Sequence, residues 1–128
     1  MKVLIIGGVA AGTKTAAKLK REDRNIEVTV ITKDKDISYA GCGLPYYVGG
    51  LIEGRDELIV NTPQKYSALT GVEVRTGKEA VALDAEKKEV TVQDVQTGEK
   101  EVCSYDKLVV AVGASPAVLP IEGKELAG

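Results

Sequence analysis

Two short apolar runs, Lys2 to Ile6 and Leu108 to Val112, stand out in the pattern of hydrophobic and polar positions. Neither run alternates between apolar and polar residues, which is typical of strands covered on both faces of a parallel sheet. Val28 to Ile31 predicts another strand, and the alanine-rich segment from about Ala10 to Arg21 predicts a helix. The first run, this helix and the strand at 28–31 together form a βαβ unit of about thirty residues. We expect the helix to pack through Ala11, Ala16, Ala17 and Leu19.

The second half of the chain predicts one more helix and then a series of strands. Thr62 and Pro63 are suited to the N-cap and the first position of a helix, and Gly71 is suited to its C-cap. Beyond Gly71 the apolar pattern shifts toward a period of two, which indicates strands separated by charged or glycine turns. The strands are expected at 72–75, 80–84, 89–95 and 101–105. The charged stretch 84–89 indicates a solvated hairpin tip, and Thr97-Gly98 indicates another turn.

Composition limits the class of protein. A length of 128 residues allows one hydrophobic core but not two full domains. With 17 basic and 19 acidic residues, the chain gives no reason to expect nucleic acid as a partner. No apolar run approaches the ~20 residues of a membrane span, so we expect no membrane partner either. The sequence has no histidine, which excludes imidazole catalysis and histidine metal sites, and we expect no metal.

The cysteine count indicates a reducing compartment. Two cysteines, Cys42 and Cys103, do not make the disulfide framework of a small secreted protein. The N-terminus is not a signal peptide, because Gly7 and Gly8 interrupt the apolar run and a charged helix follows. We therefore expect a cytoplasmic protein.

A glycine-rich turn follows the first strand, at Gly7-Gly8-Val9-Ala10-Ala11-Gly12. A dinucleotide turn needs glycine where the chain bends and where backbone meets pyrophosphate, and the next helix supplies free amides. Gly7 and Gly12 occupy the first and third positions of the G-x-G-x-x-G pattern, and Val9 occupies the middle one. The alternative is a turn that serves only helix–sheet packing.

The end of the second predicted strand departs from the usual dinucleotide pattern. An acidic residue that binds the ribose diol is expected there, and Thr32 occupies its place. The Thr32 hydroxyl can still meet a ribose, more weakly than a carboxylate. Lys33 could instead contact a 2′-phosphate, which leaves NADP possible.

Cys42 lies between two glycines in the segment SYAGCGLPYY, residues 38–47. A cysteine acts as a redox nucleophile in its thiolate form, which the N-terminus of a helix favours. Cys42 would gain this help if it opens a short helix toward Val48. The alternative is an inert, buried thiol.

The segment 38–47 resembles the active-site loop of the single-cysteine, FAD-dependent pyridine nucleotide-disulfide oxidoreductases. This group comprises the coenzyme A-disulfide reductases, NADH oxidases and NADH peroxidases. The turn GGVAAG at 7–12 is similar to the FAD turn of this group, and YDKLVVAVGASP at 105–116 to its second flavin motif, with Val112 where threonine is usual. The resemblance spans essentially the whole chain.

The resemblance implies a Rossmann-like FAD-binding fold, α/β, with a parallel sheet that carries an antiparallel β-meander. Residues 1–128 would be the first part of a discontinuous FAD domain, without the NADH-binding and dimerisation domains. NADH or NADPH would be the co-substrate, and the full-length protein a homodimer. The fragment alone would be inactive and would self-associate through its exposed sheet edge. The last ten residues are expected to form no terminal element.

The resemblance also implies roles for individual residues. Cys42 would cycle between a thiolate and either a mixed disulfide with coenzyme A or a sulfenic acid. Position 47 is Tyr47, so the second cysteine of two-cysteine relatives is absent. The expected cofactor contacts are Gly7, Gly8, Val9, Ala10, Ala11, Gly12, Thr32, Lys33, Val81, Ala111 and Gly113.

The expected substrate contacts favour a disulfide reductase slightly. Lys14, Lys18 and Arg21 lie on one face of the first helix, and their charges suit the phosphates of coenzyme A. The alternative for them is an ordinary solvated face. Ser38 and Gly41 complete the expected set, and Gly41 replaces the asparagine that is frequent there. An NADH oxidase or peroxidase, and a non-catalytic nucleotide-binding module, remain the other functions. Cys103 is expected to be a small packed hydrophobe.

Overall fold

The computed structural model describes residues 1–115, 117–123 and 125, and its strands form two separate sheets. The first sheet is parallel, with the strand order β3-β2-β1-β7. Its strands are β1 Lys2–Ile6, β2 Glu27–Thr32, β3 Glu73–Thr76 and β7 Lys107–Val110. The second sheet is an antiparallel meander, β4-β5-β6. Its strands are β4 Lys78–Asp84, β5 Glu89–Asp94 and β6 Lys100–Ser104. The predicted fold class is confirmed.

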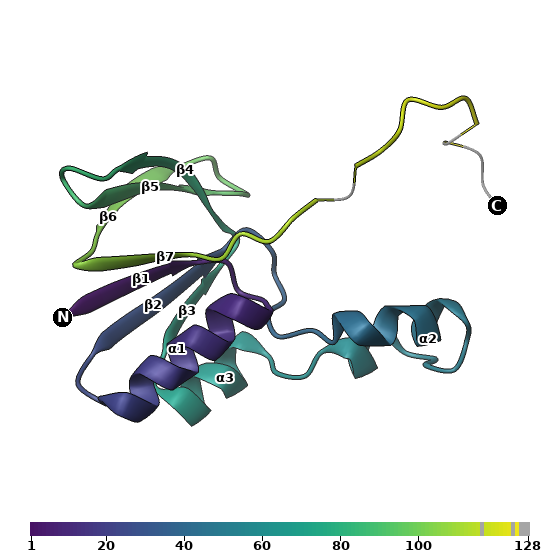
Figure 1. Ribbon diagram of the computed structural model, residues 1–128, viewed down its shortest axis with the longest axis horizontal. Coiled ribbons are helices and arrows are strands. Elements are labelled where there is room, and N and C mark those ends of the chain that lie inside the picture. Colours follow the sequence, from purple (N-terminus) through teal and green to yellow (C-terminus); the bar gives the residue numbers. More distant parts are fainter. Residues whose placement is uncertain (116, 124, 126–128) are drawn as a thin grey trace.

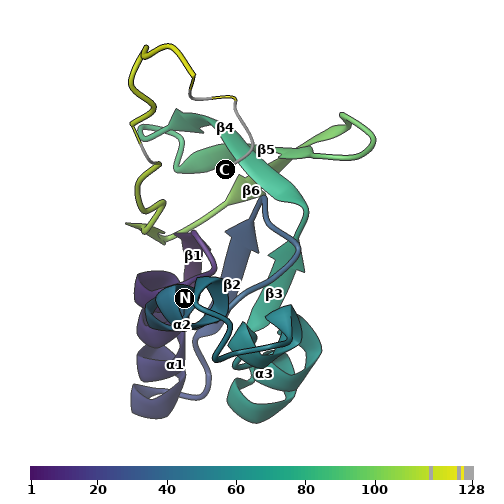
Figure 2. The ribbon, with the colours of Figure 1, turned by 90° about the vertical axis from the view of Figure 1, so that its right-hand side faces the viewer.

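The parallel sheet lies between two helices and the meander (Figures 1 and 2). Helices α1 (Ala10–Glu22) and α3 (Pro63–Thr70) cover one face, and the meander covers the other. A projecting arm between β2 and α3 carries the short helix α2 (Leu44–Val48). Two 3₁₀ turns, Gly41–Gly43 and Arg55–Leu58, flank α2 in sequence. No pattern in the sequence predicted the second of these turns.

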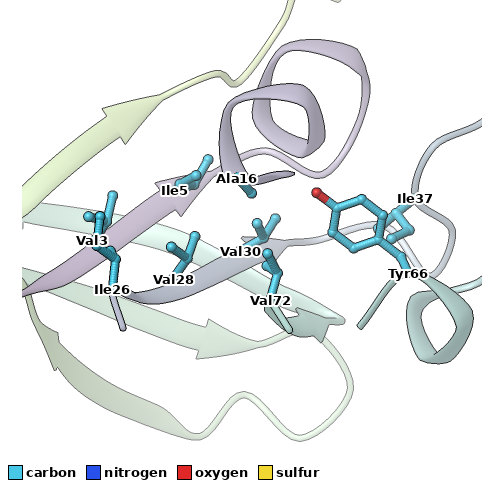
Figure 3. Packing of buried hydrophobic residues seen from close by; sticks show 9 residues of the cluster. All are labelled: Val3, Ile5, Ala16, Ile26, Val28, Val30, Ile37, Tyr66 and Val72. Carbon is cyan, nitrogen blue, oxygen red and sulfur yellow. The ribbon is translucent and has the colours of Figure 1, made fainter. Parts of the chain in front are cut away.

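Both faces of the parallel sheet are buried, which explains the continuous apolar runs. Val3 and Ile5 of β1 pack toward the helices with Ala16 of α1 and Tyr66 of α3, as Figure 3 shows. Leu4 points the other way and packs with Val90 and other residues of the meander. Alternate residues of one strand thus enter two different cores.

The predicted elements match the structure to within a few residues. Helix α3 begins and ends as predicted: the Thr62 hydroxyl accepts a hydrogen bond from the Lys65 amide at 3.2 Å, and Gly71 is left-handed with φ 73°. Two expectations need correction. Ala11 is exposed rather than packed, because it lies on the outer side of the first turn of α1. The last strand ends at Val110 rather than at Val112.

The C-terminal segment after β7 has no regular secondary structure in the part that the structure describes. Residues 111–115 and 117–123 form no helix or strand, in keeping with the expectation for the terminal segment. Pro116, which ends the expected second flavin motif, and residues 124 and 126–128 lie outside the described residues. Among the described residues, no helix is both long and apolar enough to cross a membrane.

Asp94 gives the meander a measurable dependence on pH. Its carboxylate accepts hydrogen bonds from the amides of Thr97 (2.9 Å) and Gln96 (2.8 Å), and Lys78 lies 3.2 Å away. These contacts, the Thr97 amide first, lower the pKa of Asp94 from 3.8 to about 2. A carboxyl whose pKa is lower in the folded chain stabilises the fold at higher pH, and this stabilisation is lost as the pH falls from 3.8 toward 2.

We therefore expect Asp94→Asn to remove part of the acid sensitivity of folding. Urea unfolding measured at several pH values between about 5 and 2 checks this. The urea concentration at the unfolding midpoint should fall more in the wild type than in the variant over this range. An equal fall of the midpoint with pH in the two proteins would show that Asp94 is not responsible.

Candidate functional site

The glycine turn between β1 and α1 is closed so tightly that side chains are excluded at both of its ends. Gly7 has φ 113°, and a Cβ there would overlap the carbonyl of Ala111 after β7. A Cβ on Gly12 would overlap the carbonyl of Gly7. Gly12 therefore lets the first turn of α1 approach the bend closely, as a dinucleotide turn requires.

The N-terminus of α1 is left open for an anion. Val9 is its N-cap residue and provides no side-chain hydrogen bond, and the first turn contains no acidic residue. The first amides of a helix lack partners within the helix, and its dipole favours a negative charge at that end. The turn and the helix together offer a phosphate site.

A cleft of about 230 Å³ opens beside this turn, at the carboxyl ends of β1 and β2; we call it the cofactor cleft. The glycine turn forms one side, residues 31–34 another, the start of β4 a third, and residues 111–113 the last. Its lining residues are Ile6, Gly7, Gly8, Val9, Ile31, Thr32, Lys33, Asp34, Lys78, Glu79, Ala80, Ala111, Val112 and Gly113. This is where parallel α/β sheets bind ligands.

Most of the predicted cofactor contacts meet in the cofactor cleft. Gly7, Gly8, Val9, Thr32, Lys33, Ala111 and Gly113 line it. Ala10, Ala11 and Gly12 belong to the start of α1 instead. Val81 is half-exposed at a bulge of β4 and does not line the cleft, whereas its neighbours Lys78, Glu79 and Ala80 do. Sequence reasoning missed Lys78 and Asp34.

Lys78 is a charged group of the cleft that is already neutralised by the protein. Its ammonium lies 3.2 Å from Asp94 and 3.5 Å from Glu101, and the hydrogen bond with Asp94 is the main cause of its raised pKa. Glu101 also lies 3.7 Å from Arg75 of β3. This network ties the meander to the parallel sheet and so fixes the wall of the cleft that β4 forms.

Cys42 lies at the beginning of the projecting arm and is exposed. The expectation that it opens the helix needs correction: it sits inside the 3₁₀ turn Gly41–Gly43, and α2 begins two residues later, at Leu44. Backbone hydrogen bonds hold the base of the arm. The amide of Ala40 donates to the carbonyl of Leu58 (2.7 Å), and the amide of Val60 to the carbonyl of Ser38 (3.0 Å).

A second hollow, of about 300 Å³, lies between α1, α3 and the base of the arm; we call it the basic groove. It brings together three of the predicted substrate residues, Lys14, Arg21 and Ser38. Lys18 does not line it, and its ammonium pairs with Glu22 one turn further along α1. Gly41 does not line it either.

The basic groove continues toward the end of α1. An adjoining hollow of about 570 Å³ shares Ala17 and Arg21 with it and adds Lys20 and Arg24. Lys20 is used by the fold, since its ammonium donates to the carbonyls of Arg24 (2.7 Å) and Ile26 (3.0 Å). Arg24 is a cation that the sequence did not predict here, because it lies in the turn after α1 and outside the helical spacing of Lys14, Lys18 and Arg21.

Tyr66 joins the two helices beneath the basic groove. Its hydroxyl donates a hydrogen bond to the carbonyl of Thr13 in α1, and burial raises its pKa. The ring is buried in the helix–sheet core (Figure 3). Tyr66 therefore fixes the distance between the two walls of the groove.

Cys103, the second cysteine, is a packing residue as expected. It is half-buried beside the core between the two sheets, and its sulfur accepts a weak hydrogen bond from Arg75 at 3.9 Å. Burial raises the pKa of the Cys103 thiol, which disfavours the reactive thiolate. Among the described residues, no group of three or more acidic or cysteine side chains is placed to bind a metal ion.

Comparison with known proteins gives matches to this chain in both sequence and shape. The family model described as "Pyridine nucleotide-disulphide oxidoreductase" matches residues 1–128. An NADH oxidase of Methanocaldococcus jannaschii is 37% identical over 128 residues, which are 100% of this chain and 28% of that protein. A coenzyme A disulfide reductase of Staphylococcus haemolyticus is 37% identical over 113 residues, 88% of this chain and 26% of that protein.

A solved structure agrees with these matches. The NAD-dependent persulfide reductase from A. fulgidus superposes with a TM-score of 0.90 at 40% identity, covering 98% of this chain and 23% of that one. The chain thus spans about a quarter of the length of the relatives it matches.

Proposed function

Because this chain belongs to the pyridine nucleotide-disulphide oxidoreductase family, we propose that it is part of an FAD-dependent reductase with Cys42 as its redox group. The electron donor is NADH or NADPH, and the favoured substrate is the disulfide of coenzyme A. The observation that carries the proposal is the combination of a closed dinucleotide turn with a cysteine loop anchored directly on it. A turn that served packing alone would not need the open helix end and the adjoining cleft.

The residues of the cofactor cleft fit the pyrophosphate of FAD. The turn has no room for side chains at Gly7 and Gly12, and the first amides of α1 are uncapped. The ribose end is less typical. Thr32 takes the place of the expected carboxylate; it is only 6% exposed, and its methyl group faces Gly8. In the proposal, Thr32 and Lys33 contact the ribose, and Ala111 and Gly113 lie on the flavin side.

In the proposed mechanism Cys42 exchanges disulfide bonds with the substrate. The Cys42 thiolate attacks one sulfur of coenzyme A disulfide, a Cys42–coenzyme A disulfide forms, and one coenzyme A thiolate leaves. FAD, when bound, supplies the electron pair that NADH or NADPH has donated. Two electrons and a proton return Cys42 to its thiolate and release the second coenzyme A as a thiol. A single cysteine suffices because the substrate provides the other sulfur.

The basic groove supports coenzyme A as the substrate. Lys14 and Arg21 face the same hollow as Ser38, four residues before Cys42. Two cations in a groove that also reaches Ser38, at the start of the loop that carries Cys42, suit a ligand with phosphates at one end and sulfur at the other. Lys18 and Gly41 stay in the proposed contact set, with a smaller share for Lys18 because Glu22 already pairs with it.

The substrate assignment predicts a selective kinetic change in the full-length protein. Lys14→Ala with Arg21→Ala should raise the KM for coenzyme A disulfide about tenfold or more, since two charge-assisted contacts are lost. Turnover with a peroxide should be unchanged. Lys87→Ala is the matched control, because Lys87 lies at the distant hairpin tip. An unchanged KM in the double variant would move the proposal to an NADH oxidase or peroxidase.

An oxidase or peroxidase is the second candidate, and the M. jannaschii relative favours it. In that case the Cys42 thiolate attacks one oxygen of hydrogen peroxide, the O–O bond breaks, hydroxide leaves, and Cys42 becomes a sulfenic acid. The third candidate is a nucleotide-binding module without catalysis, in which Cys42 has no role. We further propose that residues 1–128 are the first part of a discontinuous FAD domain. A cytoplasmic homodimer is proposed for the full-length protein, and self-association for this segment alone.

A further inference from the structure

The loop that leads to Cys42 crosses directly over the glycine turn. Ile37, five residues before Cys42, is fully buried and belongs to the helix–sheet core beside Tyr66 (Figure 3). Its Cγ2 methyl lies where a side chain of Gly8 would be: a Cβ on Gly8 would be 2.9 Å from Ile37 Cγ2 and 2.9 Å from Thr32 Cγ2. Gly8 has no positive φ, so only these neighbours exclude a side chain from it.

Ser38 makes a second connection at the same point. Its amide donates to the carbonyl of Gly8 at 3.2 Å, and its carbonyl accepts from the amide of Val60 at 3.0 Å. Ser38 has φ 53°, a left-handed conformation that a residue other than glycine seldom adopts. One residue therefore joins the glycine turn, the loop to Cys42 and the segment that returns from the arm at Val60.

We propose that Gly8, Ile37 and Ser38 are positioning residues that fix the Cys42 loop against the glycine turn. The proposal rests on the proposed function in that Cys42 is the redox group that they position. The Ile37 methyl occupies the space that Gly8 leaves free, and the two Ser38 hydrogen bonds hold the loop in register with the turn. The missing side chain at Gly8 thus makes room for the cysteine loop, whereas Gly7 and Gly12 allow the turn itself to close.

This assignment explains the left-handed backbone of Ser38. Its amide must point back to Gly8 while its carbonyl points to Val60, and an extended residue would direct these groups differently. Strained backbone of this kind persists when the surroundings over-determine it, and it clusters at functional sites. The buried Ile37 on one side and the paired base of the arm on the other provide those surroundings.

Residue-resolved amide hydrogen exchange of the intact protein tests the proposal without cofactor, substrate or turnover. Gly8→Ala should reduce the protection of the Ser38, Ala40 and Val60 amides about tenfold, because the added methyl displaces Ile37. The amides of β2 before Thr32 should keep their protection, because the added methyl meets this strand at its last residue, Thr32. Gly54→Ala is the matched control, since its added Cβ meets only the side chain of Glu57. Unchanged protection at all three amides, or equal loss throughout the chain, would overturn the proposal.

Compensating variants separate the loop contact from general crowding. Leucine has no methyl on Cβ, so Gly8→Ala with Ile37→Leu should restore most of the lost protection. Gly8→Ala with Ile37→Val keeps the Cγ2 methyl and should not restore it. Gly8→Ala with Thr32→Ser should not restore the protection either, because it removes only the contact with the Thr32 methyl group. Rescue by valine or by serine, or no rescue by leucine, would contradict the assignment.

Ser38 provides a test that does not depend on Gly8. Ser38→Gly keeps the backbone and relaxes φ, so the Ala40 and Val60 amides should stay protected. Ser38→Val places a β-branched side chain at a positive φ and should lose about tenfold in protection. Equal protection in the two variants would show that the backbone of residue 38 does not position the loop. These exchange results do not decide whether Cys42 is catalytic, so the two proposals fail separately.

Discussion

Cys42→Ser in the full-length protein is expected to lose disulfide-reducing turnover by roughly a thousandfold or more, the scale seen when a catalytic nucleophile is removed. A serine hydroxyl is not ionised at neutral pH and cannot form the mixed disulfide. The cofactor cleft lies in other parts of the chain, at the glycine turn and the strand ends. FAD binding should therefore stay close to that of the wild type.

Cys103→Ser is the matched control for this substitution. Cys103 is half-buried between the sheets, and its raised pKa disfavours the thiolate. We expect the turnover of Cys103→Ser to be nearly unchanged, with at most a small loss of stability. NADH-dependent turnover of both variants, measured with coenzyme A disulfide and with peroxide, checks the pair. Full activity in Cys42→Ser would exclude the proposed mechanism for either substrate.

Gly12→Ala is expected to have the largest effect on stability. The added methyl would overlap the carbonyl of Gly7, and neither backbone can move without separating α1 from the sheet. Overpacking of this kind costs about 3 kcal/mol in free energy of unfolding. FAD affinity should fall as well, because the same shift moves the first amides of α1.

Urea unfolding of Gly12→Ala beside Gly54→Ala measures this effect. The added Cβ of Gly54→Ala meets only the flexible side chain of Glu57, so that variant should be close to wild type. A Gly12→Ala protein as stable as the control would show that the close approach of helix and turn is not needed for the fold.

The sequence was sufficient where a local pattern has one physical meaning. The apolar run of β1 predicted a strand covered on both sides, and the structure buries Leu4 and Ile5 in two different cores. Thr62, Pro63 and Gly71 marked the ends of α3 because capping depends on neighbouring residues only. Gly7 and Gly12 indicated the turn through requirements that are also local, namely the φ of 113° at Gly7 and the overlap that a Cβ on Gly12 would make with the Gly7 carbonyl.

Features that depend on distant residues could not be predicted. The segments 73–76 and 78–84 are separated by Gly77 alone, yet they enter different sheets, because the chain turns there with φ 66°. The pairing of residues 38–40 with 58–60 joins segments twenty residues apart and has no sequence signal. The spacing of Lys14, Lys18 and Arg21 predicted one face, but in the structure Lys18 pairs with Glu22 and does not line the groove.

Flavin analysis of the purified full-length protein tests the proposal that this chain holds FAD beside a redox-active Cys42. We expect a yellow protein with the absorbance of bound flavin, stoichiometric FAD, and bleaching of that absorbance by NADH or NADPH. Coenzyme A disulfide should restore the colour in the wild type but not in Cys42→Ser. A colourless protein that fails to take up added FAD would contradict the account.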